Sequence, residues 1–498
     1  MRRVVVLLSL LALCGLASGC GGHHDKGSSA LDDAVGYFSK DAPFVAAVST
    51  DPNGPQIKQV ESLVGRLPVA AILGVRLRNF SRIRNAEFTR DIKPQLGAPL
   101  VVGLLRPAAG KDIGAAVVLA MRIKHPLEAK QTILREPGFL GSSKSSGVRI
   151  YQDAPDQRYL AVDGGVLVAA TDRGILEQAL AMKRNDNRMH ASGFQHDLEG
   201  LPRGGLISVS ADLQQMIGVD ARLRPALSVK WLASLRRLGA VVKASPSGFT
   251  LDFHQATNSG SLSDADLPLA PKTGAPIPLI GKAGELQVGV REPGRLARLA
   301  VAVLNAVAPS HIAKARAQEP KGIDLEQQLP RHLAAVGTAA VNLLTREFAL
   351  RLALHDSAEV RTALTRLAPA LPALGATFGV KGLGIATPME GESFYALAKP
   401  NGKTAVFGVV GDSFVAASQA QRAAELSSEA THTVPGARGS AVITVDARDL
   451  VGRLLASHLS GAAALLAPLA VASLRDFTGA LTINRSGLNG HFKLTIVK

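Results

Sequence analysis

Short apolar runs and amphipathic segments alternate along most of this chain. Runs such as 44–49 and 100–105 have the length of strands and are bounded by turn-forming residues. Residues 173–181 place apolar side chains at helical spacing, which predicts a helix with one buried face. The sequence Asp163-Gly164-Gly165 is a tight-turn signal between two further apolar runs. Hairpins combined with single connecting helices predict an α+β fold with a largely antiparallel sheet.

Four segments of the first half have counterparts in the second half, in the same order. The matched pairs are 124–134 with 354–364, 159–172 with 406–419, 206–213 with 442–450, and 247–253 with 486–492. We therefore expect two duplicated modules, at 41–255 and 279–498, each a largely antiparallel sheet packed with helices. Identity within the matched segments is low, so the interpretation depends on their common order.

Two polar segments are predicted to connect these parts. Residues 21–40 begin with small and polar residues and are expected to form a flexible tether. Residues 256–278 are rich in Ser, Gly, Asp and Pro and are expected to form a linker between the modules. His23, His24 and Asp25 could hold a metal loosely, but a plain polar linker is the favoured interpretation, and no metal site is predicted.

Three segments rich in Ala and Leu are expected to be helices, at 296–308, 333–344 and 462–472. Their small apolar side chains could line a cavity for a lipid tail. Close packing of helix against sheet explains the same composition and is favoured.

The N-terminus has the pattern of a secretory signal. Arg2 and Arg3 precede the apolar run 4–13, and small residues follow up to Cys20. A cysteine directly after the small residues resembles a bacterial lipoprotein signal. The resemblance implies that residues 1–20 contain a lipoprotein signal peptide and that Cys20 is diacylated and becomes the mature N-terminus. The protein would then be exported and anchored to the outer face of the cell membrane.

Composition narrows the possible functions. Of the 498 residues, 47% are apolar and 19% are charged, which suits a globular chain with large cores. Cys14 and Cys20 are the only cysteines, so the folded body has no disulfide or thiolate site. The net charge of +16 suggests contact with anionic lipid headgroups, anionic wall polymer or a protein partner. A solvated basic surface explains the charge equally well, and export with 4% aromatic residues disfavours nucleic acid.

No catalytic, cofactor or metal-binding pattern is found. The chain has no G-x-S-x-G, S-x-x-K or H-E-x-x-H motif. His125 and His355 occupy matched positions before predicted helices, where a helix-start role is favoured over a ligand site. The carboxylate pairs Asp32/Asp33 and Asp446/Asp449 have no partner pattern that would place them against a substrate. The chain is therefore not expected to be an enzyme.

Several of these segments resemble one family. They are Asp51-Pro52 after the first strand, residues 91–97, the strand 147–151 and the return 164–170. Together they are similar to the exported actinobacterial lipoproteins of domain of unknown function 3352, over about 40–260. The resemblance implies no activity and no functional residues. The expected function is a non-catalytic binding or scaffolding module of the cell envelope. The alternative is a carrier that shelters a lipid or other hydrophobic ligand between its Ala/Leu-rich helices.

Overall fold

The structure is a computed structural model of the chain. It describes residues 27–66, 82–83, 86–87, 93–105, 116–135, 139–153, 158–271, 275–380, 382–389, 394–398, 404–458 and 471–497. The predicted signal peptide, Cys20, and the residues His23, His24 and Asp25 lie outside the described residues.

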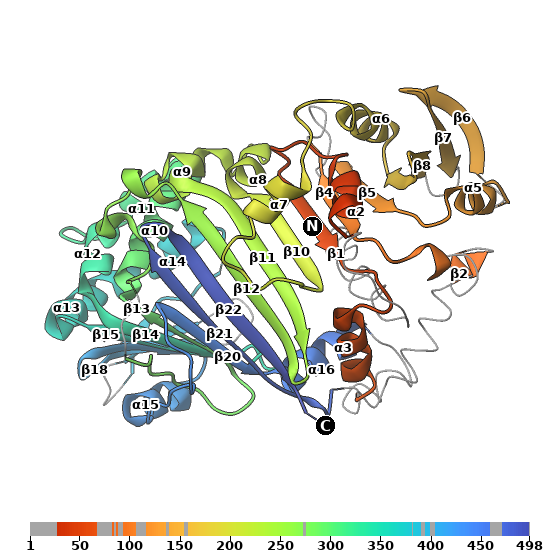
Figure 1. Cartoon of the computed structure of the whole chain (residues 1–498). Coiled ribbons are helices and arrows are strands. Elements are labelled where there is room, and N and C mark those ends of the chain that lie inside the picture. The colour runs from red at the N-terminus through yellow and green to blue at the C-terminus, as the bar shows by residue number, and fades with distance from the viewer. Residues whose placement is uncertain are drawn as a thin grey trace.

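The first half combines a sheet with helices on its faces (Figure 1). Its strands are β1 (Phe44–Val48), β4 (Leu100–Leu104), β5 (Val117–Arg122), β6 (Phe139–Ser145), β7 (Val148–Asp153), β8 (Arg158–Asp163), β9 (Val166–Ala170), β10 (Ile207–Asp212), β11 (Leu235–Ser245) and β12 (Gly248–Thr257). Its helices are α2 (Gly27–Val35), α3 (Pro55–Val64), α5 (Pro126–Arg135), α6 (Arg173–Met182), α7 (Ala191–His196), α8 (Leu213–Val219) and α9 (Lys230–Ser234), with the short turns η2 (Lys93–Gln95) and η4 (Arg224–Ser228). A separate small hairpin joins β2 (Arg82–Ile83) to β3 (Ala86–Glu87).

The second half follows after the short turns η5 (Ser259–Ser261) and η6 (Asp264–Asp266). Its strands are β13 (Leu286–Arg291), β14 (Leu333–Val341), β15 (Phe348–Leu354), β16 (Thr387–Pro388), β17 (Phe394–Ala398), β18 (Thr404–Val410), β19 (Ser413–Ala417), β20 (Ala441–Asp446), β21 (Leu474–Asn484) and β22 (Gly487–Ile496). Its helices are α10 (Pro293–Val307), α11 (Pro309–Arg316), α12 (Leu325–His332), α13 (Ser357–Leu367), α14 (Leu371–Thr377), α15 (Ala420–Ser428) and α16 (Ala447–His458), with η7 (Ala368–Ala370) between α13 and α14.

The strands of the two halves are hydrogen-bonded in the same relative order, and every pair is antiparallel. The first half runs β6-β7-β8-β9-β5-β4-β1-β10-β11-β12. The second half runs β16-β17-β18-β19-β15-β14-β13-β20-β21-β22. β12 pairs with β22, with Asp252 opposite His491 near the middle.

The expectation of a separate sheet in each module is therefore wrong, since the strands form one 20-stranded sheet. The open edge strands that end the two halves satisfy each other's backbone groups.

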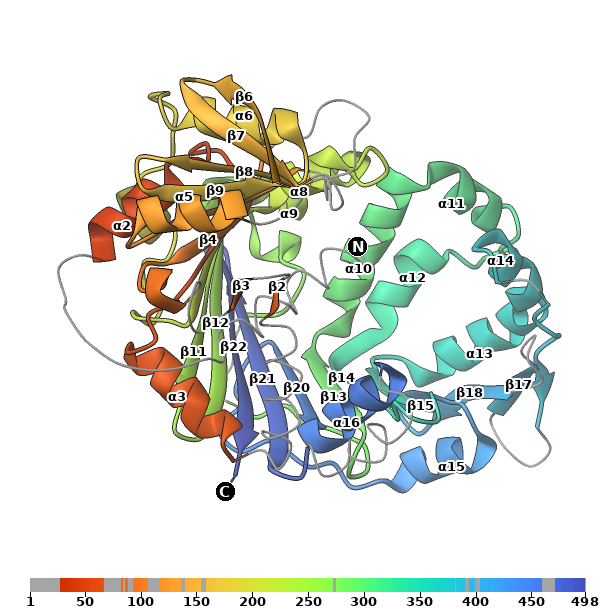
Figure 2. The same ribbon diagram turned by 90° about the vertical axis from the view of Figure 1, so that its right-hand side faces the viewer.

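Hydrophobic clusters also join the two halves. At one end of the central strands, Leu63 of α3 packs with Leu474 and Ile496 of the second half. At the other end, Trp231 of α9 packs with Ile483. In Figure 2, α3 and α16 flank the lower ends of the long strands β11, β12, β22 and β21, and α10 lies to the right of these strands. Because both ends share a core, the halves are not independent domains connected by a loose linker.

Aromatic rings cross the seam between the halves. Phe253 stacks on Phe492 with ring centroids 6.1 Å apart, and Phe492 stacks on Phe477 at 5.8 Å. Glycine makes this possible, because a Cβ at Gly490 would lie 2.1 Å from the ring of Phe253 and one at Gly479 would lie 2.1 Å from the ring of Phe492. Stacking over glycine thus replaces the cross-strand side-chain pairs that would otherwise stabilise this part of the sheet.

Three local expectations are wrong. From residue 27 the expected tether is instead α2 and a turn, with Tyr37 and Phe38 fully buried against the sheet. The segment 256–278 connects the halves, but its first two residues belong to β12, and Leu267 and Ile277 are buried. Residues 333–341 form strand β14 rather than a helix, because hydrogen bonds to β13 and β15 on both sides override the helix propensity of alanine.

Other local expectations are confirmed. The helix predicted at 173–181 is α6, and its four apolar side chains Ile175, Leu176, Ala179 and Leu180 are buried. Asp172 caps it by accepting a hydrogen bond from the Ile175 N–H. The turn at Gly164 and Gly165 has φ of 57° and 86°, as a two-residue hairpin requires. Of the three Ala/Leu-rich segments, 296–308 is helical as α10, and most of 462–472 lies outside the described residues.

Candidate binding cleft

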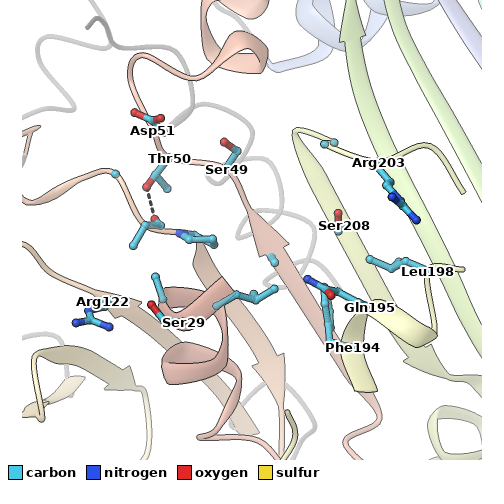
Figure 3. A pocket seen from close by; sticks show the side chains of 18 of the residues that line it. Ser29, Ser49, Thr50, Asp51, Arg122, Phe194, Gln195, Leu198, Arg203 and Ser208 are labelled. Carbon is cyan, nitrogen blue, oxygen red and sulfur yellow. Dashed lines mark hydrogen bonds between the residues drawn. The ribbon is translucent and has the colours of Figure 1, made fainter. Parts of the chain in front are cut away.

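An open cleft of about 1700 Å³ lies in the first half (Figure 3). It opens on the face of the sheet that α2 and α7 cover, where the ends of β1 and β5 meet the loop that leads into β10. The lining includes hydroxyl, amide and charged side chains as well as exposed backbone at several glycines. The side chains used below are Ser49, Thr50, Asp51, Arg122, Lys124, Arg203 and Ser208.

The floor of the cleft is a row of three residues that are cross-strand neighbours on β1, β10 and β11. Ala47 on β1 pairs with Ser208 on β10, and Ser208 pairs with Val241 on β11. All three line the cleft, because side chains in register on adjacent strands point to the same face. The Ser208 hydroxyl makes no hydrogen bond to any described residue, so the floor offers one polar group between two apolar ones.

One wall of the cleft is formed by α7 and residues 197–206, which we call the wall loop. Asp197 fixes its start by accepting hydrogen bonds from Arg237 Nε at 2.6 Å and from the Ser210 hydroxyl at 2.5 Å. Both charged side chains are largely buried, with 12% of Asp197 and 23% of Arg237 exposed. Near the loop's end, a Cβ at Gly205 would lie 2.4 Å from Val241, so glycine lets the chain rest directly on β11.

The opposite wall consists of α2 and of loops at the strand ends. Thr50 donates a hydrogen bond from its hydroxyl to the Ala98 carbonyl at 2.5 Å, which fixes the loop before β4 (Figure 3). Gly97 has φ of 134°, and a Cβ there would lie 2.5 Å from Cε of Lys124. The absence of a side chain at Gly97 therefore leaves room for the Lys124 stem to lie across this loop.

The charged side chains that line the cleft have both signs: Arg122, Lys124 and Arg203 are cations, and Asp51 and Glu199 are anions. Lys124 and Arg203 are exposed and make no ion pair with any described residue. Arg122 is half-exposed and pairs with Asp33 at 2.5 Å. Glu199 pairs with His196 at 3.2 Å, while Asp51 is bound through the Asn53 backbone N–H. Lys124 and Arg203, which have no ionic partner among the described residues, are therefore the groups of the cleft that can bind an anionic ligand.

The buried Tyr37, which follows α2, supports this wall through its hydroxyl group. Tyr37 donates from its hydroxyl to Asp163, with 3.3 Å to the carboxylate and 3.2 Å to the carbonyl oxygen. Burial, reinforced by the negative charge of Asp163, raises the pKa of Tyr37 well above its usual value. Lys183 lies 5.3 Å from the Tyr37 ring centroid and donates to the Asp33 carbonyl, and burial lowers the pKa of Lys183.

The structure gives helix-start or pairing roles to the polar residues singled out in the sequence. The His125 carbonyl accepts the first-turn hydrogen bond of α5 from Ala129, and His355 directly precedes Asp356, which caps α13. The matched histidines therefore lie at helix starts, as favoured.

Neither carboxylate pair converges on a site. Asp32 accepts from the Ala191 N–H of α7, and Asp33 pairs with Arg122. Asp446 accepts from the Arg448 N–H at the start of α16. Within the described residues there is no group of three or more His, Cys, Asp or Glu that could hold a metal ion.

The cleft itself was not predicted. It depends on strand register and on the path of the wall loop, neither of which is visible in the order of residues. The glycines at 200, 204 and 205 are the sequence signal that could have drawn attention to the loop.

The first half matches a known family model. Residues 3–242 match the model described as protein of unknown function (DUF3352). The predicted domain of unknown function is thereby confirmed, and the match includes every residue of the cleft.

Solved structures with a likeness to this chain include two crystal forms of TP0453. Form III is 8% identical with a TM-score of 0.27, and form I is 10% identical with a TM-score of 0.26; each match covers 45% of this chain and 79% of that one. No curated protein matches the chain. Among the described residues no single helix is long and apolar enough to span a membrane, while α10 and α11, bent by 113°, meet that criterion only as a pair.

Proposed function

We propose that this protein is a non-catalytic lipoprotein of the cell envelope that binds an anionic wall polymer in the cleft. The observation that carries the proposal is the pair of uncompensated cations, Lys124 and Arg203, on opposite walls of an open polar cleft. The hydroxyls of Ser49 and Ser208 line the same cleft (Figure 3). Hydroxyls and backbone groups suit the hydroxyls of a sugar or polyol chain, and the cations suit its phosphate or carboxylate groups.

The shape of the cleft supports a polymer as the ligand. A volume of about 1700 Å³ exceeds the range usual for small-molecule pockets, which is about 300–1,000 Å³. Since the cleft is also open to solvent, a chain could enter and leave it while several repeating units stay in contact.

The lipid-carrier alternative has less support. None of the described residues of the Ala/Leu-rich segments lines the cleft, and one of those segments is a strand. An acyl chain in this cleft would leave Ser208, Lys124 and Arg203 facing hydrocarbon, which is costly for polar and charged groups.

The duplication predicted from the sequence is part of the same proposal. Support comes from the shared strand order of the halves and from the antiparallel pairing of their last strands. In this interpretation, the repeat extends the sheet that carries the cleft.

Binding is tested with the full-length protein in detergent micelles and soluble poly(glycerol phosphate). We expect Arg203→Gln to weaken binding about fivefold, the loss of one charge-assisted contact. The matched control is Arg438→Gln, because Arg438 is an exposed arginine on the loop that leads into β20 of the second half. Binding should weaken as salt rises. Equal effects of the two substitutions, or equal binding of uncharged dextran, would count against the proposal.

The anchor is tested separately by the mass of the protein isolated from its own membranes. Diacylation at Cys20 predicts a covalent lipid increment on the N-terminal peptide and release of Cys20→Ser from the membrane fraction. An unmodified Cys20 would remove the anchor from the proposal without affecting the cleft.

A further inference from the structure

The floor of the cleft has a counterpart in the second half. Counted from the closing hairpins β11–β12 and β21–β22, Val241 corresponds to Ala480 and Ser208 to Val442. Val442 pairs with Gly289 as Ser208 pairs with Ala47. The row Gly289–Val442–Ala480 therefore occupies the same place in its half as the cleft floor, and its side chains point to the same face.

This counterpart row is covered by apolar side chains of the chain itself. Val442 packs with Ile277 and Leu279, and Val434 and Ala437 lie against the same cluster. The fit is close, because a Cβ at Gly289 would lie 2.5 Å from Ile277 and 2.7 Å from Leu279. Val442 is 2% exposed, whereas its counterpart Ser208 is half-buried; the flanking floor residues Val241 and Ala47 are themselves buried. The second half thus has a packed core where the first half has an open cleft.

The difference arises from the loop before the corresponding strand. In the first half, a β-bridge joins Ser39, which precedes β1, to Arg188, which follows α6. In the second half, a β-bridge joins Leu279, which precedes β13, to His432, which follows α15. After its bridge, the first half reaches β10 through 189–206, which holds α7 and the wall loop. The second half reaches β20 through the much shorter 433–440, which turns directly onto Val442.

We infer that, of the two equivalent rows among the described residues, only the one in the first half is open to a ligand, and that Ser208 is the polar contact on its floor. In the second half the equivalent position, Val442, is covered by Ile277 and Leu279, so this half supports the sheet and offers no cleft there. The identity of the ligand rests on the proposed function, whereas the open cleft and the filled counterpart do not depend on it. At this one position the second half has a buried valine where the first half has a half-buried serine, so an apolar side chain replaces a polar one.

Thiol labelling tests the geometry without any ligand. Ser208→Cys and Val442→Cys each add one cysteine, and peptide mass spectrometry separates it from Cys14 and Cys20. In the full-length protein we expect iodoacetamide to modify Cys at 208 at least about tenfold faster than at 442, because burial shields the latter thiol. Equal labelling rates in the folded protein would overturn the inference of one open site.

Stoichiometry and matched substitutions test the role of Ser208. With a short poly(glycerol phosphate) fragment we expect one bound fragment per chain. Ser208→Val should weaken binding about fivefold, the effect of one lost hydrogen bond. Val442→Ser should leave the affinity unchanged in protein that remains folded by circular dichroism. Two bound fragments, or an effect of Val442→Ser equal to that of Ser208→Val, would overturn the inference. Absence of binding by the unaltered protein would instead refute the proposed ligand, and the labelling rates would still decide between one site and two.

Discussion

Replacing Asp197 with asparagine removes the charge that fixes the wall loop and nearly keeps the side-chain shape. The Asp197 carboxylate receives hydrogen bonds from Arg237 and from the Ser210 hydroxyl. Without it, Arg237 keeps only neutral acceptors, which are the Ser210 hydroxyl at 2.5 Å and the Lys40 and Ala42 carbonyls at 3.3 Å and 3.4 Å. The guanidinium would then be mostly buried with hydrogen bonds but no charged partner.

The size of the effect follows from the burial of the pair. Removing one partner of a fully buried ion pair costs about 3–5 kcal/mol, whereas an exposed pair contributes about 0–1 kcal/mol. Asp197 is 12% exposed and Arg237 is 23% exposed, so the cost lies below the buried limit. We expect Asp197→Asn to lower the free energy of unfolding by about 2 kcal/mol.

The assay is urea unfolding at neutral pH, followed by circular dichroism and by the fluorescence of Trp231, the sole tryptophan in the sequence. Glu199→Gln is the matched control, because Glu199 and His196 are 80% and 79% exposed. The control should change stability by less than about 0.5 kcal/mol. If Asp197→Asn changed it as little as the control, the wall loop would not depend on this ion pair.

Two further predictions concern the support behind the cleft. Phe38→Ala should destabilise the protein by about 3–5 kcal/mol because Phe38 is fully buried. Leu127→Ala should have almost no effect because Leu127 on α5 is 75% exposed. Urea unfolding measures both free energies, and similar costs would contradict the packing of residues 27–40. Burial raises the pKa of Tyr37 in the folded state, so the unfolded chain releases this proton first as pH rises above about 10, and the free energy of unfolding falls there. Tyr37→Phe should make that fall smaller. If the alkaline dependence of stability were unchanged, the phenol would not be buried.

Local structure was the part of the fold that the sequence predicted well. Helix α6 and the turn at Gly164 and Gly165 follow from spacing and turn chemistry, which act between near neighbours. β14 was mistaken for a helix because alanine favours helices, and the pairing with β13 and β15 that decides the outcome joins residues far apart in the chain.

The site was harder to predict, for the same physical reason. Ser208 becomes a floor residue through its register with Ala47 and Val241, and Arg203 reaches the cleft through the anchoring of Asp197. No spacing rule connects these residues. The order of matched segments could not show that β12 and β22 pair, so that the strands of both halves form one sheet.

Hydrogen exchange of the full-length protein with and without poly(glycerol phosphate) tests the central claim most directly. The account predicts slower exchange at the backbone amides of the wall loop and of residues 97–98 when the polymer is bound, with no change at 433–440 in the second half. Protection at 433–440 equal to that at the wall loop, or polymer binding with no protection at either, would contradict a binding site in the cleft of the first half.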